Sequence, residues 1–533
     1  MAPPRLTTLP PEILHHIFTQ LDPADIVTLL PHVCSAFRAF TKGNRKLHRD
    51  IYLQNLDPPS NLDLDYETEI RDIVRLRAIC LHPRTAKKRR ELEFVHDVVN
   101  RLLQNASPSE TSRTRTYKPN THASSHNADL LKQFFTSQST REAFLQRSSL
   151  FERVRNERHG PVTSDGSAMA AVRQRSAKLH CLYGKPILHV GPHHQRTYPY
   201  AASKVYDLRQ YTRDTRWGPF LDDGSDRVDW EKVEAIIVVL VYNLSQRVDV
   251  ESLFYEAWNA PFSGSWPGSF SQPSPSSPPS NLELRDPYGV TGVWYRIVCF
   301  LDYNTLFSYN FPVGDLLDAY MPRPPLDADE VTRLITMKIY VTKIEEPGPE
   351  DGQDLPVVHF KGRSHSLDNS MDGDANSGLR GIECKGTVRL TREGEVRWTT
   401  FSIFHGQERW RSEGIQLGGV GSARGVIGHW FDRDYDVHGP AGPTAFWKAR
   451  NETAPPQTAV DDMTAANYVP YAPFLDFDDL ASDSEDGFPD DEDDGQEEIH
   501  ELEVNQEIPG LLLDAQLDVM DVLDVVHQQA EQT

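Results

Sequence analysis

The sequence predicts an α+β protein with a helical N-terminal part, a mainly antiparallel β sandwich or barrel, and a disordered acidic tail. Over residues 1–178, apolar residues recur at the three- and four-residue spacing of amphipathic helices. From 179 to 450, short apolar runs rich in β-branched and aromatic residues alternate with glycine- and proline-containing turns. Residues 451–533 contain 24 acidic residues and no lysine or arginine, so the tail accounts for the formal net charge of −23.

The first forty residues predict three short helices. Pro10 and Pro11 suit a helix start, because proline fixes φ and needs no N–H in the first turn. Asp22 is a good N-cap for a second helix, and a third follows over 32–42. The apolar stripe of the first helix consists of Ile13, Leu14, Ile17, Phe18 and Leu21.

These helices are too few and too apolar to cover one another. Units of this size usually need a metal, a disulfide or a partner for stability. The segment offers one cysteine, Cys34, and no metal-ligand pattern. The pattern fits two ways of burying these apolar residues. They pack on the rest of this chain, on which the helices would form a subdomain, or they bind a partner protein.

The order of residues in this segment resembles the F-box. The motifs are Leu9-Pro10-x-Glu12-Ile13-Leu14, Ile17-Phe18-x-x-Leu21-Asp22-Pro23-x-Asp25 and Val33-Cys34-x-x-Phe37. The resemblance covers residues 6–55, and Phe37 stands where the family often has Trp. It implies binding to the Skp adaptor and, through it, to a cullin in a Skp–cullin–F-box (SCF) ubiquitin ligase. The residues it places against the adaptor are Leu9, Pro10, Ile13, Leu14, Ile17, Phe18, Leu21, Leu29, Val33 and Phe37.

Residues 56–178 predict a helical region with a disordered insert at 104–128, which is rich in Ser, Thr, Asn and Pro. A basic cluster at 84–90 lies at the start of one of its helices. The cluster fits a nuclear localisation signal, a nucleic-acid contact or a solvated helix start. No aromatic residues are interleaved with it, which argues against single-stranded nucleic acid, and we expect no nucleic-acid partner.

Residues 179–450 predict a β-rich domain that recognises a substrate. The runs at 179–184, 205–208 and 235–242 favour strands, although the last also fits a buried helix. Further strand-like runs follow from residue 289 onward. Two polar segments, 261–281 and 364–379, interrupt the pattern and are expected to be surface insertions.

One part of the β region combines a glycine- and proline-containing loop with aromatic and arginine residues. Its order, Ser402-x-Phe404-His405-Gly406 and then Gly439-Pro440-Ala441-Gly442, looks like the receptor domain of the F-box-only subfamily that captures cyclin D-type substrates in a β-barrel. That likeness implies a peptide or degron pocket near these loops, and core aromatics joined by turns are the alternative. The candidate substrate-binding residues are His405, Arg409, Trp410, Trp430, Phe446 and Trp447.

No motif predicts catalytic residues, a metal or a cofactor. GxSxG, HExxH and a P-loop are missing from the sequence. Four histidines at 180, 189, 193 and 194 match no common metal spacing, and we expect them on the surface or in loops. Five widely spaced cysteines indicate reduced thiols in the cytosol or nucleus. No run of eighteen apolar residues occurs, so no membrane partner is expected.

The acidic tail, 451–533, repels itself and lacks apolar residues over much of its length, which predicts disorder. An amphipathic helix is expected within it at 508–527. Together these observations predict a non-catalytic substrate receptor of an SCF ubiquitin ligase. Two alternatives stay open: a transcriptional or chromatin adaptor that uses the acidic tail, and an enzyme with an unrecognised pocket in the β domain.

Overall fold

The computed structural model describes ten stretches of the chain. They are residues 6–59, 63–109, 123–156, 167–191, 195–246, 258, 260–272, 278–312, 321–367 and 381–452. All belong to one compact unit, Met1–Val460, and the second unit, Asp461–Thr533, lies outside the described residues. The expected disordered tail and its helix at 508–527 therefore stay predictions.

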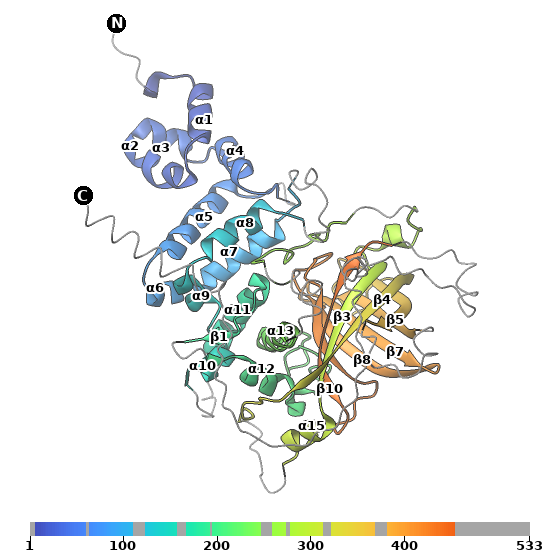
Figure 1. Cartoon of the computed structure of the whole chain (residues 1–533). Coiled ribbons are helices and arrows are strands. Elements are labelled where there is room, and N and C mark those ends of the chain that lie inside the picture. The colour runs from blue at the N-terminus through green and yellow to red at the C-terminus, as the bar shows by residue number, and fades with distance from the viewer. Residues whose placement is uncertain are drawn as a thin grey trace, which may run out of the picture. The chain divides into compact units, whose positions relative to one another are not determined.

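The first part of the described chain is helical, as predicted (Figure 1). The N-terminal helices are α1 (Pro11–Thr19), a π-helical turn (Asp25–Leu29), α2 (Leu30–Val33), α3 (Ser35–Thr41) and α4 (Arg45–Asn55). The helical region continues with α5 (Tyr66–Leu81), α6 (Thr85–Arg89), α7 (Leu92–Gln104), α8 (His126–Phe134), α9 (Gln138–Phe144), α10 (Ser149–Asn156), α11 (Ser167–Tyr183), α12 (Tyr198–Val205) and α13 (Trp230–Ser245).

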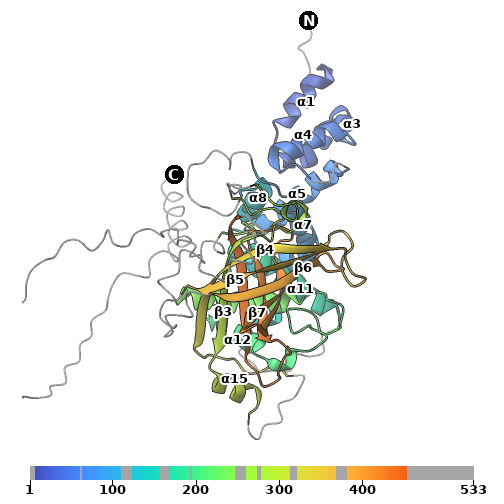
Figure 2. The same ribbon diagram turned by 90° about the vertical axis from the view of Figure 1, so that its right-hand side faces the viewer.

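Eight antiparallel strands close into a barrel, which resolves the predicted sandwich or barrel in favour of a barrel (Figure 2). They are β3 (Gly292–Leu301), β4 (Glu330–Glu345), β5 (Val357–Ser366), β6 (Ile382–Leu390), β7 (Val396–Phe404), β8 (Gln407–Gln416), β9 (Val426–Asp432) and β10 (Ala441–Arg450). Each strand pairs with the next along the chain, and β10 closes on β3. A short helix, α15 (Tyr303–Asn310), follows β3, and a two-stranded ribbon of β1 (His189–Val190) and β2 (Gln195–Arg196) lies in the helical part.

Alternate residues of each strand face the barrel interior, and one end of that interior is a packed apolar core. Trp294 lies 5.0 Å from Trp398 and 5.9 Å from Phe446 between ring centroids, in T-shaped contacts. Phe360 adds a fourth ring, 5.5 Å from Trp398. All four side chains are at most 2% exposed, so this end of the barrel is filled.

Our prediction of strands in the first part of the β region is wrong. Residues 179–183 belong to α11, residue 205 ends α12, and 235–242 lie within α13. Almost every residue of α13 is buried, so it shows no amphipathic period, and its β-branched residues resemble a buried strand. The Asp229 side chain caps this helix by accepting hydrogen bonds from the backbone N–H groups of Glu231 and Lys232. The barrel itself begins at Gly292.

The expected surface insertion at 261–281 is also wrong in its first half. Phe262 and Trp266 are fully buried. The Arg424 guanidinium, from the loop between β8 and β9, donates to Ser265 Oγ at 3.1 Å and to the carbonyl oxygens of Gly184 and Ala260. This segment therefore packs between the helices and the filled end of the barrel.

The remaining predicted inserts lie mostly outside the described residues. For 104–128, residues 110–122 are not described, while both ends are ordered around the Asp57 carboxylate. That carboxylate accepts hydrogen bonds from the backbone N–H groups of Ser107 and His126. For 364–379, the described part belongs to β5 and the residues just after it.

Helix α13 contacts both halves of the described chain, the helices α10–α12 on one side and β3, β4, β9 and β10 on the other. Ile297, Cys299, Ile427 and Ala445 face outward from these strands and join the same buried cluster as the apolar residues of α13. None of the described helices combines the length and apolarity needed to cross a membrane.

A lysine is buried in this interface. The Lys232 Nζ atom donates to the Lys204 carbonyl oxygen and to Gln210 Oε1, each at 3.0 Å, and lies 5.1 Å from the Tyr211 ring centroid. Burial, together with the nearby charge of Lys204, lowers the pKa of Lys232 to about 7.

We expect a Lys232→Met variant to lose part of the pH dependence of stability. Between pH 7 and 10.5 the unfolded chain keeps the Lys232 proton and the folded chain releases it, so the stability contributed by this site rises with pH. The free energy of unfolding of wild type, minus that of the variant, should rise by up to about 1.4 kcal/mol per pH unit from pH 7 to 9. Urea unfolding at both pH values measures it, with Lys361→Met, at an exposed position, as control. Equal pH dependence in all three proteins would contradict the assignment.

Candidate functional site

The N-terminal helices have a small core of their own. Phe18 is 3% exposed, and its ring makes T-shaped contacts with Phe37 at 5.2 Å and Phe40 at 5.5 Å. Leu14 and Ile26 are buried in the same cluster. Three of the ten residues predicted to contact the adaptor, Leu14, Phe18 and Phe37, thus support the fold from inside and leave little side-chain surface for a partner.

Other residues of that set point to solvent. Ile13 is 48% exposed on α1, Leu29 is 58% exposed in the π-helical turn, and Val33 is 64% exposed on α2. Pro10 is exposed, while Leu9, Ile17 and Leu21 are half-buried. We call the exposed residues Pro10, Ile13, Leu29 and Val33 the exposed apolar face. Large apolar side chains that stay this exposed on a small helical unit are typical of a protein-binding surface.

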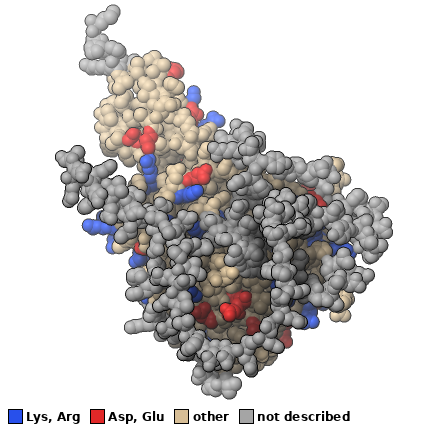
Figure 3. All heavy atoms as spheres, in the orientation of Figure 1, with Lys and Arg blue, Asp and Glu red and all other residues tan. Residues whose placement is uncertain are grey.

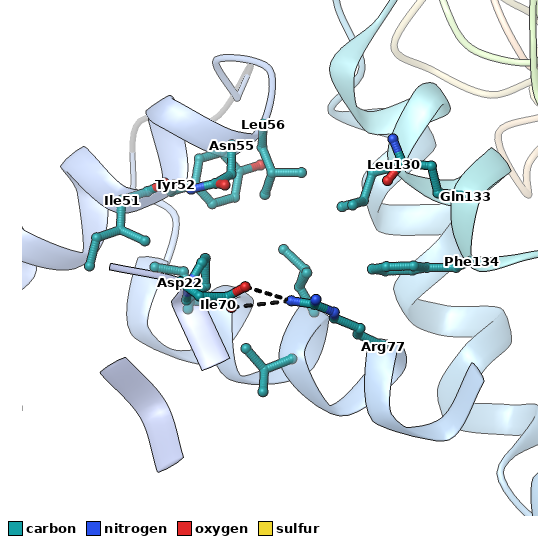
Figure 4. Close-up of a pocket in the computed structure, with 13 residues that line it drawn as sticks. Asp22, Ile51, Tyr52, Asn55, Leu56, Ile70, Arg77, Leu130, Gln133 and Phe134 are labelled. Carbon is teal, nitrogen blue, oxygen red and sulfur yellow. Dashed lines mark hydrogen bonds and ion pairs between the residues drawn. The ribbon is translucent and has the colours of Figure 1, made fainter. Parts of the chain in front are cut away.

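An open cavity of about 230 Å³ lies where the N-terminal helices meet α5 and α8 (Figure 4). Its walls include Ile51, Ile70 and Phe134. Across its rim, Arg77 Nη1 lies 2.9 Å from Asp22 Oδ2, and this hydrogen bond lowers the pKa of the Asp22 carboxyl. The ion pair is nearly half exposed, so it orients the N-terminal helices on α5 but contributes little to stability.

The second candidate surface is the end of the barrel opposite its apolar core. Here the inward-facing side chains of Phe300, Trp410 and Trp430 form an aromatic series. Trp430 makes T-shaped contacts with Trp410 at 5.2 Å and with Phe300 at 6.2 Å. The guanidinium of Arg409 lies 5.0 Å from the Trp410 ring, and that of Arg333 lies 5.4 Å from the Phe300 ring. We call these five residues the barrel mouth.

The barrel mouth is accessible to solvent. Arg333 and Arg409 are exposed, and Phe300 and Trp410 are half-buried although they face the interior. Trp430 is 8% exposed, and its Nε1 donates to the Cys299 carbonyl oxygen at 2.9 Å, which fixes the ring. Aromatic rings held rigidly beside arginines bind peptides with little loss of conformational entropy.

Below the barrel mouth, a positive charge is buried inside the barrel. Arg296 is 8% exposed, its Nε donates to Thr444 Oγ1 at 3.0 Å, and its guanidinium lies 6.0 Å from the Phe446 ring. No acidic side chain among the described residues pairs with it. Burial lowers the pKa of Arg296 to about 10, so it remains charged at neutral pH. The barrel interior below the mouth therefore carries a buried positive charge without a carboxylate partner among the described residues.

The structure brings together some of the predicted substrate-binding residues and separates others. Arg409, Trp410 and Trp430 meet at the barrel mouth, and His405 is exposed in the turn between β7 and β8, with φ of 50°. Phe446 lies deep in the barrel core. Trp447 faces the outside of the barrel and packs against Trp258 at 6.2 Å, so these last two residues are core aromatics.

Phe300, Arg333 and Arg296 were not among the residues that the sequence motifs predicted for substrate binding. The sequence contains one signal for Arg296. It alternates with its neighbours along one strand, so it lies on the same inward face as Trp294 and Val298. A charged residue at an inward-facing position of a barrel strand is unusual, since charged groups are rarely buried without a partner.

The predicted surface position of His180 is wrong. It is 3% exposed on α11, and its Nδ1 lies 2.7 Å from Glu234 Oε1 on α13. Its Nε2 accepts a hydrogen bond from the Ile187 backbone N–H, which leaves Nδ1 to donate. Burial raises the pKa of Glu234. This pair joins α11 to α13. His189 lies in the two-stranded ribbon, and 193 and 194 are outside the described residues.

Comparison with known families identifies the N-terminal segment. A family model described as F-box-like matches residues 6–54. Searches of curated proteins and of solved structures found no match. Residues 6–54 are thus an F-box-like domain, which confirms the resemblance drawn from the motifs. The likeness of the barrel loops to the subfamily that captures cyclin D-type substrates stays a prediction.

Core and exposed residues of the F-box-like domain should respond differently to truncation. Phe18→Ala removes a buried ring, and we expect it to lower the local stability of α1–α3 by about 3–5 kcal/mol. Ile13→Ala changes an exposed side chain and should cost under about 1 kcal/mol. Hydrogen exchange of the amides of α1 and α3 in the full chain measures both. A loss for Ile13→Ala as large as that for Phe18→Ala would show that Ile13 belongs to the core.

Proposed function

We propose that this protein is a non-catalytic substrate-recognition subunit of an SCF ubiquitin ligase. The observation that carries the proposal is the F-box-like domain at 6–54 with its exposed apolar face. In this role the domain binds the Skp adaptor and, through it, a cullin. The rest of the chain binds a target protein, which is then ubiquitinated and degraded.

The adaptor side rests on the burial of exposed apolar groups. Ile13, Leu29 and Val33 are each about half exposed or more, and covering the exposed part of such side chains stabilises a complex by about 1–2 kcal/mol each before the costs of association. The separate core around Phe18 keeps these residues in place before the adaptor binds. Such preorganisation lowers the entropic cost of binding.

The substrate side rests on the barrel mouth. Its aromatic rings and arginines suit an extended peptide segment of a target protein, and Arg296 below them suits an acceptor group on that segment. The contribution to ubiquitination is proximity. A bound target is held near the ubiquitin-conjugating enzyme, so an intermolecular attack becomes effectively intramolecular. The proposal assigns no chemical step to residues of this chain.

A cytosolic or nuclear location belongs to the same proposal. All five cysteines are free thiols, and Cys80, Cys181, Cys299 and Cys384 are buried. Free thiols at these positions suit the reducing compartments in which SCF ligases would act.

The first test concerns the adaptor. We expect wild type to co-purify with the Skp adaptor and cullin, and an Ile13→Asp, Val33→Asp double variant to co-purify with neither, because two charges would be desolvated in the interface. Leu81→Asp is a matched control, since Leu81 is 72% exposed on α5, outside the F-box-like domain. Both positions of the double variant are exposed, so its thermal unfolding should match wild type. Wild type that binds neither partner would overturn the proposal.

The second test concerns the barrel mouth. We expect Trp410→Ala and Arg296→Met each to lower the recovery of bound target proteins and of their ubiquitin-modified forms by about tenfold or more, as for central interface residues. Arg392→Met, an exposed change in the turn between β6 and β7, is the matched control. Quantitative proteomics after proteasome inhibition measures recovery, and adaptor binding should be equal in all variants. Targets recovered equally by all four proteins would place substrate binding elsewhere.

A further inference from the structure

The helical region carries an uncompensated basic cluster that neither proposed surface uses. We infer that Arg89, Arg147 and Arg155, at the junction of α6, α9 and α10, form a binding site for a phosphorylated segment of a protein partner. The inference does not depend on the proposed function, because it rests on different residues.

Two hydrogen bonds bring the three arginines together. Arg147 Nη1 donates to the Arg89 carbonyl oxygen at 3.2 Å. Arg155 Nη2 donates to the carbonyl oxygen of Gln146, the residue before Arg147, at 2.7 Å. The side chains of Arg147 and Arg155 are thus each positioned by a backbone carbonyl, and Arg89 is exposed at the end of α6 beside Arg147. Burial and then the charge of Arg89 lower the pKa of both Arg147 and Arg155.

The acidic residues near the cluster are engaged elsewhere. Glu152 accepts from Arg173 at 2.8 Å, and Glu142 accepts from Gln138 at 2.8 Å. Glu91 pairs with Arg75 at 2.8 Å. Glu142 and Glu152 offset the repulsion among the arginines only in part. No described carboxylate forms an ion pair with Arg89, Arg147 or Arg155.

Further positive charges surround the cluster. Arg84, Lys87 and Arg90 are exposed on or beside α6, and Arg141 lies on α9. In Figure 3, Lys and Arg side chains project at the left edge, at the level of α6 in Figure 1. Lys88 instead points inward, is 2% exposed, and donates to Ser139 Oγ and Thr140 Oγ1, each at 2.8 Å. Lys88 therefore fixes α6 against α9 and leaves its neighbours facing outward.

The arrangement favours a phosphate monoester over a nucleic acid. Three arginines at one junction suit a compact dianion, which accepts charge-assisted hydrogen bonds from the guanidinium N–H groups that the backbone carbonyls leave free. A duplex would need positive charge along an extended track. Single strands would need aromatic rings between the basic residues, and none occurs at 84–90.

The test uses the full chain and three probes: a degenerate peptide library with one fixed phosphoserine, the same library without phosphate, and a 20-base-pair DNA duplex. We expect wild type to retain the phosphorylated library at least tenfold better than the unphosphorylated one, with inorganic phosphate as competitor. An Arg147→Gln, Arg155→Gln double variant should lose tenfold or more of this retention. An Arg71→Gln, Arg75→Gln variant, with the same charge change on exposed positions of α5, should stay within twofold of wild type.

Three results would overturn the inference. They are equal retention of both libraries, full retention by the double variant, and duplex binding that exceeds phosphopeptide binding and is lost in the double variant. The single variant Arg155→Gln, at an exposed position, provides the same readout if the double variant does not fold. Adaptor co-purification is measured in parallel, so failure of the F-box-like domain to bind and failure of this site are separate outcomes.

Discussion

The burial of α13 between the helices and the barrel is the interaction on which the rest of the described structure depends. Ile236, Val238 and Val239 are at most 1% exposed, and each such side chain contributes about 1.5–3 kcal/mol when fully buried. The helix contacts α10–α12 on one side and four barrel strands on the other. The helices and the outer wall of the barrel therefore share one apolar cluster, while the barrel interior forms a second cluster of its own.

Carboxylates at and near this interface are hydrogen-bonded to side-chain donors. Glu413, fully buried on the outer wall of the barrel, is hydrogen-bonded by Arg397 at 3.0 Å and by Arg411. Glu330 accepts from the hydroxyls of Tyr198 and Tyr206 on and beside α12. Buried charges without partners would cost several kcal/mol. The bonds to Glu413 therefore join β7 to β8 within the barrel wall, and the bonds to Glu330 join β4 to α12 and the residue after it.

The sequence predicted those parts of the fold in which one face of an element is buried and the other exposed. Strand β6 alternates between buried and half-buried residues over most of its length, and α7 is amphipathic, so both periods are visible in the sequence. Strands β9 and β10 are buried on both faces and carry no such period. Helix α13 was missed because burial on every side removes the period. The F-box-like domain was found through the order of its residues, but spacing could not separate Leu14, which faces the core, from Ile13, which faces solvent.

Charge patterns in this chain have to be judged locally. The tail holds 24 acidic residues and no basic ones, which leaves 55 basic and 54 acidic residues in 1–450, a net charge of +1. A nearly neutral folded part would not attract anions as a whole. Its positive charge is instead concentrated where carboxylates are missing or already paired, at Arg296 inside the barrel and at the arginines around α6. A buried or clustered arginine without a counter-ion is costly, and an anionic ligand at either place would offset that cost.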